Sequence, residues 1–514
     1  MASIDFVVLG LYGAAMVALA LWAGKGQTSR ADYYLAGRSI PAWQITASIM
    51  ATQISAVSLV GGPAFVAWKP DGGLIWLQYE LAIPLAMIVV AAVFLPAFHA
   101  SGITTIYEYL EKRFGLVART SLSVAFMLTR GLATGIIIYT SALVVAVPLG
   151  WNLGLTIGIV SAVTLLYTVV GGIKADILTD IVQLVVLWIA TIVCIFFAGG
   201  FSLEGVDPAR LRIIDASRTG FGCSGNFGLL PMVVGGFFLY VSYYACDQSQ
   251  AQRLLTAPDV ATARRAVLWN GLLRFPLALT YCAFGVVLAG FLARTPDFAA
   301  KVKDPNDLVP LFLLEHVPAG IRGLFIAGVL AAAMSSLDSA FNSLSAATME
   351  DVLRRFSRRF RDMEEKSLFR WSWILTFLWG AFCTGCAFIP ALRKETVIET
   401  INQVGSLTYG PLLGMFTLGI LTRRATEGGV VAGLVAGVAV NLGLWLGAGK
   451  SVSWLWWNAF GFAASVLVGW IWRPGVPREA PTGSMAELKR VALPLGAAFL
   501  GMVLICLLIQ SALR

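Results

Sequence analysis

The 514-residue chain is rich in apolar residues and poor in charged ones. Hydrophobic residues make up 58% of the sequence and charged residues 13%, whereas a soluble globular domain averages about 45–50% apolar and about 25% charged residues. This composition excludes an ordinary soluble enzyme. It predicts an all-α membrane protein that crosses the bilayer many times.

The formal net charge of +9 is concentrated in short polar connections, above all in an arginine-rich loop at 350–370. Short loops rich in Lys and Arg stay on the cytoplasmic side and contact anionic lipid headgroups. We therefore interpret the charge as a signal of membrane orientation and lipid contact. Nucleic-acid binding is not expected.

Thirteen or fourteen apolar segments are long enough to span a bilayer. A spanning helix needs about 20 largely apolar residues, because lipid offers no hydrogen-bond partner to an exposed peptide group. The predicted spans are 4–24, 43–67, 74–98, 118–148, 152–170, 177–199, 227–252, 264–293, 319–349, 369–390, 397–421, 428–447 and 453–472, with 489–512 as the fourteenth.

The first segment, 4–24, has no basic residue before it, while Lys25 and Arg38 follow it. A cleaved signal peptide shows the reverse pattern, so we expect a retained helix with its N-terminus outside. Alternation from that start places most of the 37 lysines and arginines in inner loops, as expected for cytoplasmic loops. Fourteen spans then put both termini outside a cell (inner) membrane.

No catalytic motif is evident. The two histidines, His99 and His316, lie far apart in the sequence, so a metal site of the HExxH type is excluded, and no GxSxG or P-loop pattern occurs. The polar connections are too short to bury a core of their own. We expect no enzyme.

Glycine and proline interrupt several apolar segments, notably at Gly61-Gly62-Pro63 in 43–67 and at Gly235-Gly236 in 227–252. Broken helices at membrane depth are tolerated where the freed backbone groups are buried or line a cavity. Each of these two segments begins a run of five, a spacing that suits two inverted repeats. Close helix packing by glycine explains the same pattern equally well.

The segment 331–348 contains an unusual density of side-chain oxygens for an apolar helix. Sodium is a hard cation, and such ions prefer oxygen ligands. Helical spacing places much of the set on one face, and the added aspartate favours an ion site over packing by small residues. The polar residues are Ser335, Ser336, Asp338, Ser339, Asn342, Ser343 and Ser345.

Ionisable residues within a membrane are costly and mark functional sites or buried pairs. Arg130 suits a substrate carboxylate, but it could equally pair with an internal acid such as Glu80 or Asp338. Asp180 lies near the inner face, where solvation competes with a functional role. Asp247 could cap a helix or take part in transport.

Other polar and aromatic groups complete the set of candidate substrate residues. Tyr240 and Tyr243 follow the Gly235-Gly236 pair, and such rings either stack on a solute or pack against neighbouring helices. Gln78, within the apolar segment 74–98, is a further candidate.

Six strings occur in the order typical of one transporter family. They are DYYLAGRSIPAW (32–43), ATQISAVSLVGGP (51–63), GGIKADILTDIVQ (171–183), DQSQAQRLLTA (247–257), AAAMSSLDSAFNSLS (331–345) and GSLTYGPLLGMFTLGI (405–420). With them the chain resembles the sodium/solute symporter family, which includes sugar, proline, sialic acid, iodide and monocarboxylate cotransporters. The matches cover most of the chain.

The resemblance implies a LeuT-type five-plus-five inverted repeat with extra helices at both ends. The expected divisions are 1–42 (N-terminal helix and loop), 43–199 and 200–422 (the two repeats), and 423–514 (C-terminal helices). The family's shared sodium site uses backbone carbonyls and two adjacent hydroxyls. Its positions here are Ala51, Ile54, Ala332, Ser335 and Ser336.

A second ion site of some family members matches Asp180, Ser335 and Ser339. This chain has Asp338 where those members have another small polar residue. Sodium, a proton or no ion therefore remain alternatives for what this second site binds.

The resemblance also bears on the substrate. Tyr243 matches the family's inner-gate aromatic residue, and Ser58 and Tyr240 match sugar-binding positions, although Tyr240 departs from the sugar pattern. Arg130 falls near an arginine that meets the carboxylate in sialic acid members.

From these features we predict a sodium-coupled symporter that imports a small polar solute by alternating access. Arg130 favours a small organic anion such as a carboxylate. The alternatives are a proton-coupled carrier that uses Asp180 and Asp338, and a transporter-like nutrient sensor that binds solute without moving it. The expected partners are sodium, the solute and membrane lipid, with no obligatory protein partner.

Overall fold

The computed structural model describes residues 2–25, 29–54, 56–200, 202–222, 225–389, 396–447, 451–472 and 488–513. Within these ranges the chain forms helices and no strand of a sheet, as predicted. Nine of the described helices are long and apolar enough to cross a membrane, or twelve if each of three bent pairs counts as one span. Every predicted segment coincides with a helix or a bent pair over its described residues.

The N-terminal part and the first repeat contain ten α-helices with short 3₁₀ and π segments. Their bounds are α1 (Ser3–Ala23), α2 (Arg30–Leu35), η1 (Ala36–Arg38), α3 (Ala42–Gln53), α4 (Ala56–Ala67), η2 (Leu74–Trp76), α5 (Leu77–Glu80), α6 (Ala82–Val89), η3 (Val90–Phe94), α7 (Leu95–Ala100), α8 (Ile106–Arg113), α9 (Leu116–Leu149) and α10 (Leu153–Phe197).

The remaining helices follow after a connection that includes η4 (Pro208–Leu211). Their bounds are α11 (Leu229–Ala245), α12 (Gln248–Leu255), α13 (Val260–Arg294), α14 (Pro296–Ala299), η5 (Pro305–Asp307), α15 (Leu308–His316), α16 (Ile321–Ala347), η6 (Thr348–Leu353), α17 (Arg354–Phe356), α18 (Arg358–Arg361), α19 (Glu365–Cys386), α20 (Val397–Ser406), α21 (Tyr409–Leu421), α22 (Glu427–Gly447), α23 (Trp454–Ile471) and α24 (Leu488–Ala512).

Three spans are bent pairs of helices, and their breaks lie in polar sequence. The α3–α4 pair bends by 54° after Gln53, the α11–α12 pair by 54° next to Asp247, and the α20–α21 pair by 40° before Tyr409. At each break the chain turns without continuing a regular helix, so backbone groups become available to ligands.

The predicted breaks at Gly61-Gly62-Pro63 and Gly235-Gly236 are wrong in position, because those residues lie inside α4 and α11. A Cβ on Gly61 would lie 2.8 Å from the backbone nitrogen of Ile398, and one on Gly235 would lie 2.2 Å from the carbonyl oxygen of Leu455. These glycines therefore allow close helix packing.

The connection between the predicted spans 152–170 and 177–199 is a kink within α10. Gly172 has φ 59° and ψ −174°, a conformation open to glycine and strained for other residues. The predicted spans 152–170 and 177–199 are thus two helices that follow one another directly across this kink.

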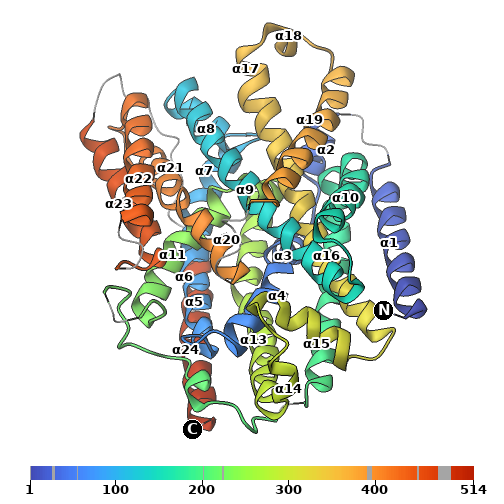
Figure 1. Ribbon diagram of the computed structural model, residues 1–514. Coiled ribbons are helices and arrows are strands. Elements are labelled where there is room, and N and C mark those ends of the chain that lie inside the picture. The colour runs from blue at the N-terminus through green and yellow to red at the C-terminus, as the bar shows by residue number, and fades with distance from the viewer. Residues whose placement is uncertain are drawn as a thin grey trace.

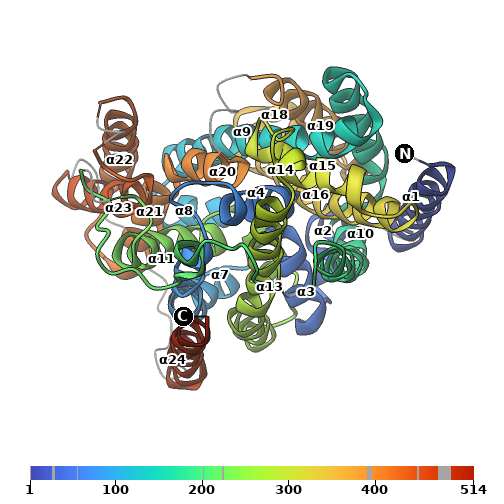
Figure 2. The ribbon, with the colours of Figure 1, turned by 60° about the horizontal axis from the view of Figure 1, so that its bottom comes forward.

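The extra helices flank the core on different sides (Figures 1 and 2). Helix α1 packs on α10 and α16, α24 packs on α6 and α13, and α22 and α23 pack together beside α21. In Figure 1 both termini lie toward the lower side, away from the arginine-rich α17 and α18 at the top. Which of these two ends faces the cytoplasm stays a prediction. The repeat boundaries 43–199 and 200–422 stay predictions.

Candidate sodium and substrate sites

The break between α3 and α4 lies against α16. Ser336 Oγ donates a hydrogen bond to the carbonyl oxygen of Thr52, at 2.8 Å, just before the break. Ser335 Oγ is buried and has no hydrogen-bond partner within the described part of the chain. A buried hydroxyl without a partner costs free energy, so this position suits a ligand.

The other predicted sodium residues lie in the same elements. Ala51 is buried in α3, and Ile54 is buried at the end of that helix. Ala332 lies in α16, but its side chain is outside the described part of the structure. The roles of all five residues in sodium binding stay predictions.

A central cavity lies directly beside this break. Thr52, Gln53 and Ser58 from the α3–α4 pair line it, together with Arg130 from α9 and Tyr240 and Tyr243 from α11. Four of the five predicted substrate residues therefore share one cavity. Thr52 connects the two sites, because its carbonyl bonds to Ser336 while the residue also lines the cavity.

Arg130 is 5% exposed and lies 3.6 Å from Asp247, measured from Nη1 to Oδ2. This separation exceeds that of a normal hydrogen bond. Its Nε is buried without a hydrogen-bond partner among the described residues. Of the two alternatives for Arg130, an internal acid does lie beside it, but that acid is Asp247 and not Glu80 or Asp338. The guanidinium of Arg130 therefore has hydrogen-bond donors available to a ligand in the cavity.

Glu80 instead pairs with Arg274, which lies on α13 and also lines the cavity. Arg274 Nε lies 3.2 Å from Glu80 Oε2, and Tyr281 Oη donates to Glu80 Oε1 at 3.1 Å. This buried pair is neutral overall. The pair forms a polar part of the cavity lining that was not predicted from the sequence.

Gln78 does not reach the cavity. It is fully buried, its Oε1 accepts a hydrogen bond from the backbone nitrogen of Asp215 at 3.0 Å, and its Nε2 donates to the carbonyl of Ile75 at 3.3 Å. The first of these bonds ties the connection between α10 and α11 to α5. They indicate a structural role.

The cavity aromatics are fixed by neighbours. Tyr243 Oη accepts a hydrogen bond from Gln250 Nε2 at 2.9 Å, and its ring centroid lies 6.1 Å from that of Tyr409. The Tyr240 ring lies 5.1 Å from the Tyr79 ring. The inner-gate role of Tyr243 stays a prediction.

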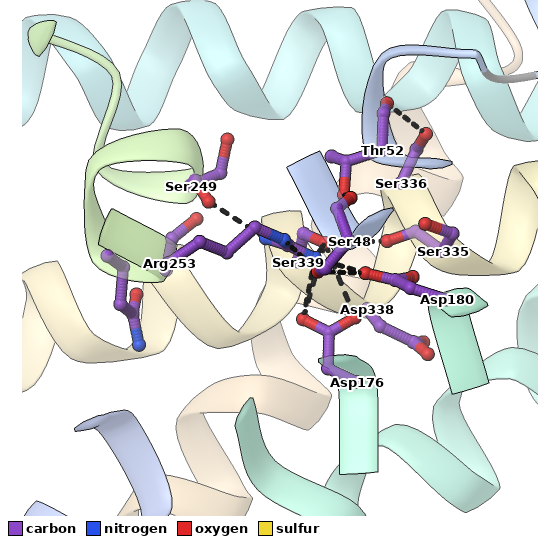
Figure 3. A network of polar contacts seen from close by, with 12 residues as sticks. Ser48, Thr52, Asp176, Asp180, Ser249, Arg253, Ser335, Ser336, Asp338 and Ser339 are labelled. Carbon is purple, nitrogen blue, oxygen red and sulfur yellow. Dashed lines mark hydrogen bonds and ion pairs between the residues drawn. The ribbon is translucent and has the colours of Figure 1, made fainter. Parts of the chain in front are cut away.

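A second polar cluster surrounds Arg253 of α12, whose side chain is fully buried (Figure 3). Its Nη2 lies 3.0 Å from both Asp176 Oδ2 and Asp180 Oδ2. Its Nε donates to Ser48 Oγ at 2.6 Å, and its Nη1 donates to the carbonyl of Ser249 at 2.8 Å.

The predicted second ion site falls within this cluster. Arg253 also donates to Ser339 Oγ, and Ser48 donates to Asp180. Two of the proposed cation ligands, Asp180 and Ser339, therefore contact an internal guanidinium. Asp338 accepts a hydrogen bond from Thr168 of α10.

Arg253 and Asp176 were not among the site residues predicted from the sequence. Arg253 follows a polar run that resembled a solvated inner loop, so no signal marked it as buried. Asp176 precedes Asp180 by four residues, one helical turn on the same face, and that spacing was available as a signal.

Asp247 caps α12. Its Oδ1 accepts a hydrogen bond from the backbone nitrogen of Ser249 at 2.8 Å, and Tyr409 Oη donates to its Oδ2 at 3.3 Å. Capping is therefore confirmed. The same carboxylate also faces Arg130.

Comparison with known proteins identifies the family. The family model of the sodium:solute symporter family matches residues 33–437. The chain belongs to this family. Its members are transporters, and the many apolar helices make this chain a multi-pass membrane protein.

Relatives within the family transport different solutes. The mouse sodium-coupled monocarboxylate transporter 1 is 31% identical over 87% of this chain and 74% of its own length. The sodium/sialic acid symporter NanT of Aliivibrio fischeri is 26% identical over 95% of this chain and 96% of its own length. The human sodium/iodide cotransporter is 29% identical over 86% of this chain and 70% of its own length.

Among solved structures, a substrate-bound, outward-open sodium-coupled sialic acid symporter superimposes with a TM-score of 0.82. It shares 24% sequence identity and covers 93% of this chain and 100% of its own. The likeness confirms the LeuT-type architecture predicted from the sequence.

Proposed function

We propose that this protein imports a small organic anion, such as a carboxylate, together with sodium. The observation that supports this proposal best is the α3–α4 break. On one side the carbonyl oxygen of Thr52 accepts a hydrogen bond from Ser336, whose neighbour Ser335 has an unpartnered Oγ among the described residues. On the other side Thr52 and Gln53 line the central cavity. Ion and solute would thus bind to opposite sides of the same few residues.

Arg130 supports an anionic solute. Its guanidinium is always charged and suits the planar geometry of a carboxylate. The loose contact with Asp247 and the unpartnered Nε leave donors for a ligand. Relatives named for monocarboxylates and for sialic acid, itself a carboxylate, are consistent with this choice.

The shared break gives a physical route for coupling. A sodium ion that fixes the carbonyls at this break also fixes the position of Thr52 in the cavity, so the solute meets a more ordered site. Such coupling is reciprocal and typically amounts to about 1–3 kcal/mol. The membrane sodium gradient can then drive solute uptake.

The test is sodium activation of uptake in proteoliposomes with the variant Ser336→Ala. Removal of one polar ligand costs about 1–3 kcal/mol, so the sodium concentration for half-maximal uptake should rise about tenfold. Ser343→Ala is the matched control, because Ser343 lies on the same helix and donates to the nearby carbonyl of Ala340 at 2.9 Å.

Equal sodium activation of the parent and Ser336→Ala would refute the sodium assignment. Uptake driven by a pH gradient in the absence of sodium would favour the proton-coupled alternative through Asp180 and Asp338. Saturable binding without counterflow would favour a nutrient sensor.

A further inference from the structure

An apolar groove lies on the surface of the helix bundle, where α3 packs against α10 and α13. Figure 2 shows α3 at the edge of the molecule beside these two helices. All three belong to apolar segments long enough to span a membrane. The groove has a volume of about 310 Å³, and it has no described lining residue in common with the central cavity.

The walls of the groove follow helical spacing. On α3 they include Trp43, Ala47 and Met50, and on α13 they include Trp269 and Leu273. Residues four or seven positions apart share one face of a helix, and the stripe on α3 extends for about 10 Å along the helix. Each helix therefore presents a continuous apolar stripe to the same groove.

The groove offers almost no hydrogen-bond partner to water. Thr46 lines it, but its hydroxyl donates to the carbonyl oxygens of Ala42 at 2.9 Å and Ala266 at 3.2 Å. Trp188, on the α10 wall, donates from Nε1 to Thr280 Oγ1 at 3.0 Å. Apolar cavities stay dry, and an empty space deprives its lining of van der Waals contacts. An apolar chain suits this space.

Positive charge lies next to the groove at the start of α13. Arg265 precedes Trp269 by four residues, one turn on the same face, and its side chain is exposed. Arg264 bonds to a backbone carbonyl of η3, and Asp259 caps α13. One carboxylate and two guanidiniums give this helix end a net charge of +1. Arginines near the membrane surface attract anionic headgroups and bind phosphate well.

We propose that the groove binds one acyl chain of an anionic phospholipid, whose phosphate contacts Arg265. Trp43 and Trp269 are exposed to the surroundings of the bundle, and tryptophan is enriched where a membrane protein meets the headgroup region. The chain and the headgroup of one lipid thus match the apolar stripe and the arginine that continues it. This proposal does not depend on the proposed function.

A bound chain would act on the helix that ends at the α3–α4 break. Met50 lines the groove, and its carbonyl oxygen accepts a hydrogen bond from the backbone nitrogen of Ile54 at 3.1 Å. A chain packed on Ala47 and Met50 holds the last turns of α3 against α10 and α13. We expect backbone hydrogen exchange in α3 to slow when the lipid is bound.

The experiment is photo-crosslinking of the purified full chain in phosphatidylcholine nanodiscs. They contain a small share of phosphatidylglycerol with a diazirine near the end of one acyl chain, and labelled peptides are identified by mass spectrometry. Phosphatidylcholine with the same diazirine is the zwitterionic reference. Ala47→Phe fills the groove. Its control is Val185→Phe, because Val185 is 52% exposed on α10 and does not line the groove. Arg265→Gln removes the charge, and the exposed Arg359 of α18 gives the control Arg359→Gln.

We expect the label in α3 and α13, with about fivefold more from phosphatidylglycerol than from phosphatidylcholine, the effect of one arginine at an anionic surface. Ala47→Phe should remove most of this label, and Arg265→Gln should make the two probes equal. Both controls should match the parent. Trp269→Ala removes a wall at an exposed position and should also lower the label, which keeps the test valid if Ala47→Phe fails to fold.

Label spread evenly over the spans, or unchanged in Ala47→Phe and Trp269→Ala, would overturn the site. Equal labelling of the parent by both probes would overturn the anionic headgroup, and displacement of the label by a sterol would overturn the phospholipid. A dimer in mass photometry that Ala47→Phe converts to a monomer would show a second copy of the chain over the groove and would also overturn the proposal. Equal hydrogen exchange in α3 with and without unmodified phosphatidylglycerol would overturn the effect on this helix.

Discussion

The protein contains two buried arginines beside aspartates that differ in how fully they are bonded. Arg253 contacts two carboxylates, two hydroxyls and one carbonyl oxygen. Arg130 has one carboxylate at 3.6 Å, beyond normal hydrogen-bond range, and an unpartnered Nε. Both side chains are at most 5% exposed.

This difference separates a structural cation from a ligand-binding one. A buried charge with every donor satisfied helps to fix helices relative to one another. Its removal leaves the partner carboxylates buried without a counter-charge. A buried charge with unsatisfied donors destabilises the unliganded protein, and a bound substrate that accepts hydrogen bonds from those donors removes this cost in free energy. We therefore infer that Arg253 holds the helices together and that Arg130 binds the solute.

Replacement of Arg253 should have the largest effect on folding. Arg253→Ala leaves Asp176 and Asp180 buried without their guanidinium, which typically costs about 3–5 kcal/mol. We expect a large loss of monodisperse protein in size-exclusion chromatography and a lower unfolding temperature. The exposed Arg358 of α18 gives a matched control, and Arg358→Ala should change stability by less than about 0.5 kcal/mol. Equal stability of the two variants would contradict the assignment of Arg253.

Replacement of Arg130 should affect uptake more than folding. Arg130→Ala removes a charge-assisted bond to the anion worth about 1.5–3 kcal/mol, so the KM for an anionic solute should rise about 10- to 100-fold. Arg130→Lys keeps the charge but loses the fork geometry and should give an intermediate KM. Unchanged anion uptake by Arg130→Ala would remove the preference for an anion.

The smallest effect is expected at Tyr243. Tyr243→Phe keeps the ring beside Tyr409 but removes the oxygen that accepts from Gln250. A single neutral hydrogen bond contributes about 0.5–1.5 kcal/mol, so the KM should change by less than about tenfold. Complete loss of transport in this variant would show that the hydroxyl, and not the ring, is essential.

The helices were predictable from the sequence because lipid requires long apolar runs, and each predicted segment forms a helix. The positions of the breaks were not. Gly61 and Gly235 suggested breaks because glycine is flexible, yet each lies where another helix backbone comes close. The true breaks, after Gln53 and next to Asp247, contain no glycine, so only tertiary context reveals them.

The candidate sites were predictable only in part. The hydroxyl-rich face of α16 and the cavity position of Arg130 followed from residue type and spacing. The partner of Arg130 could not be predicted in this way. Asp247 is 117 positions away in the chain and comes close to Arg130 through the α11–α12 bend. Arg253 was hidden for a related reason, since a polar run that is fully buried looks like a loop in sequence.

The most direct test of the central claim is uptake of a labelled short-chain monocarboxylate into proteoliposomes under an inward sodium gradient at equal pH on both sides. Ser336→Ala, Arg130→Ala and Ser343→Ala are compared with the parent. We expect concentrative uptake by the parent and Ser343→Ala, an about tenfold weaker sodium response in Ser336→Ala, and a strongly raised KM in Arg130→Ala. Uptake that is independent of sodium and unchanged in both site variants would contradict it.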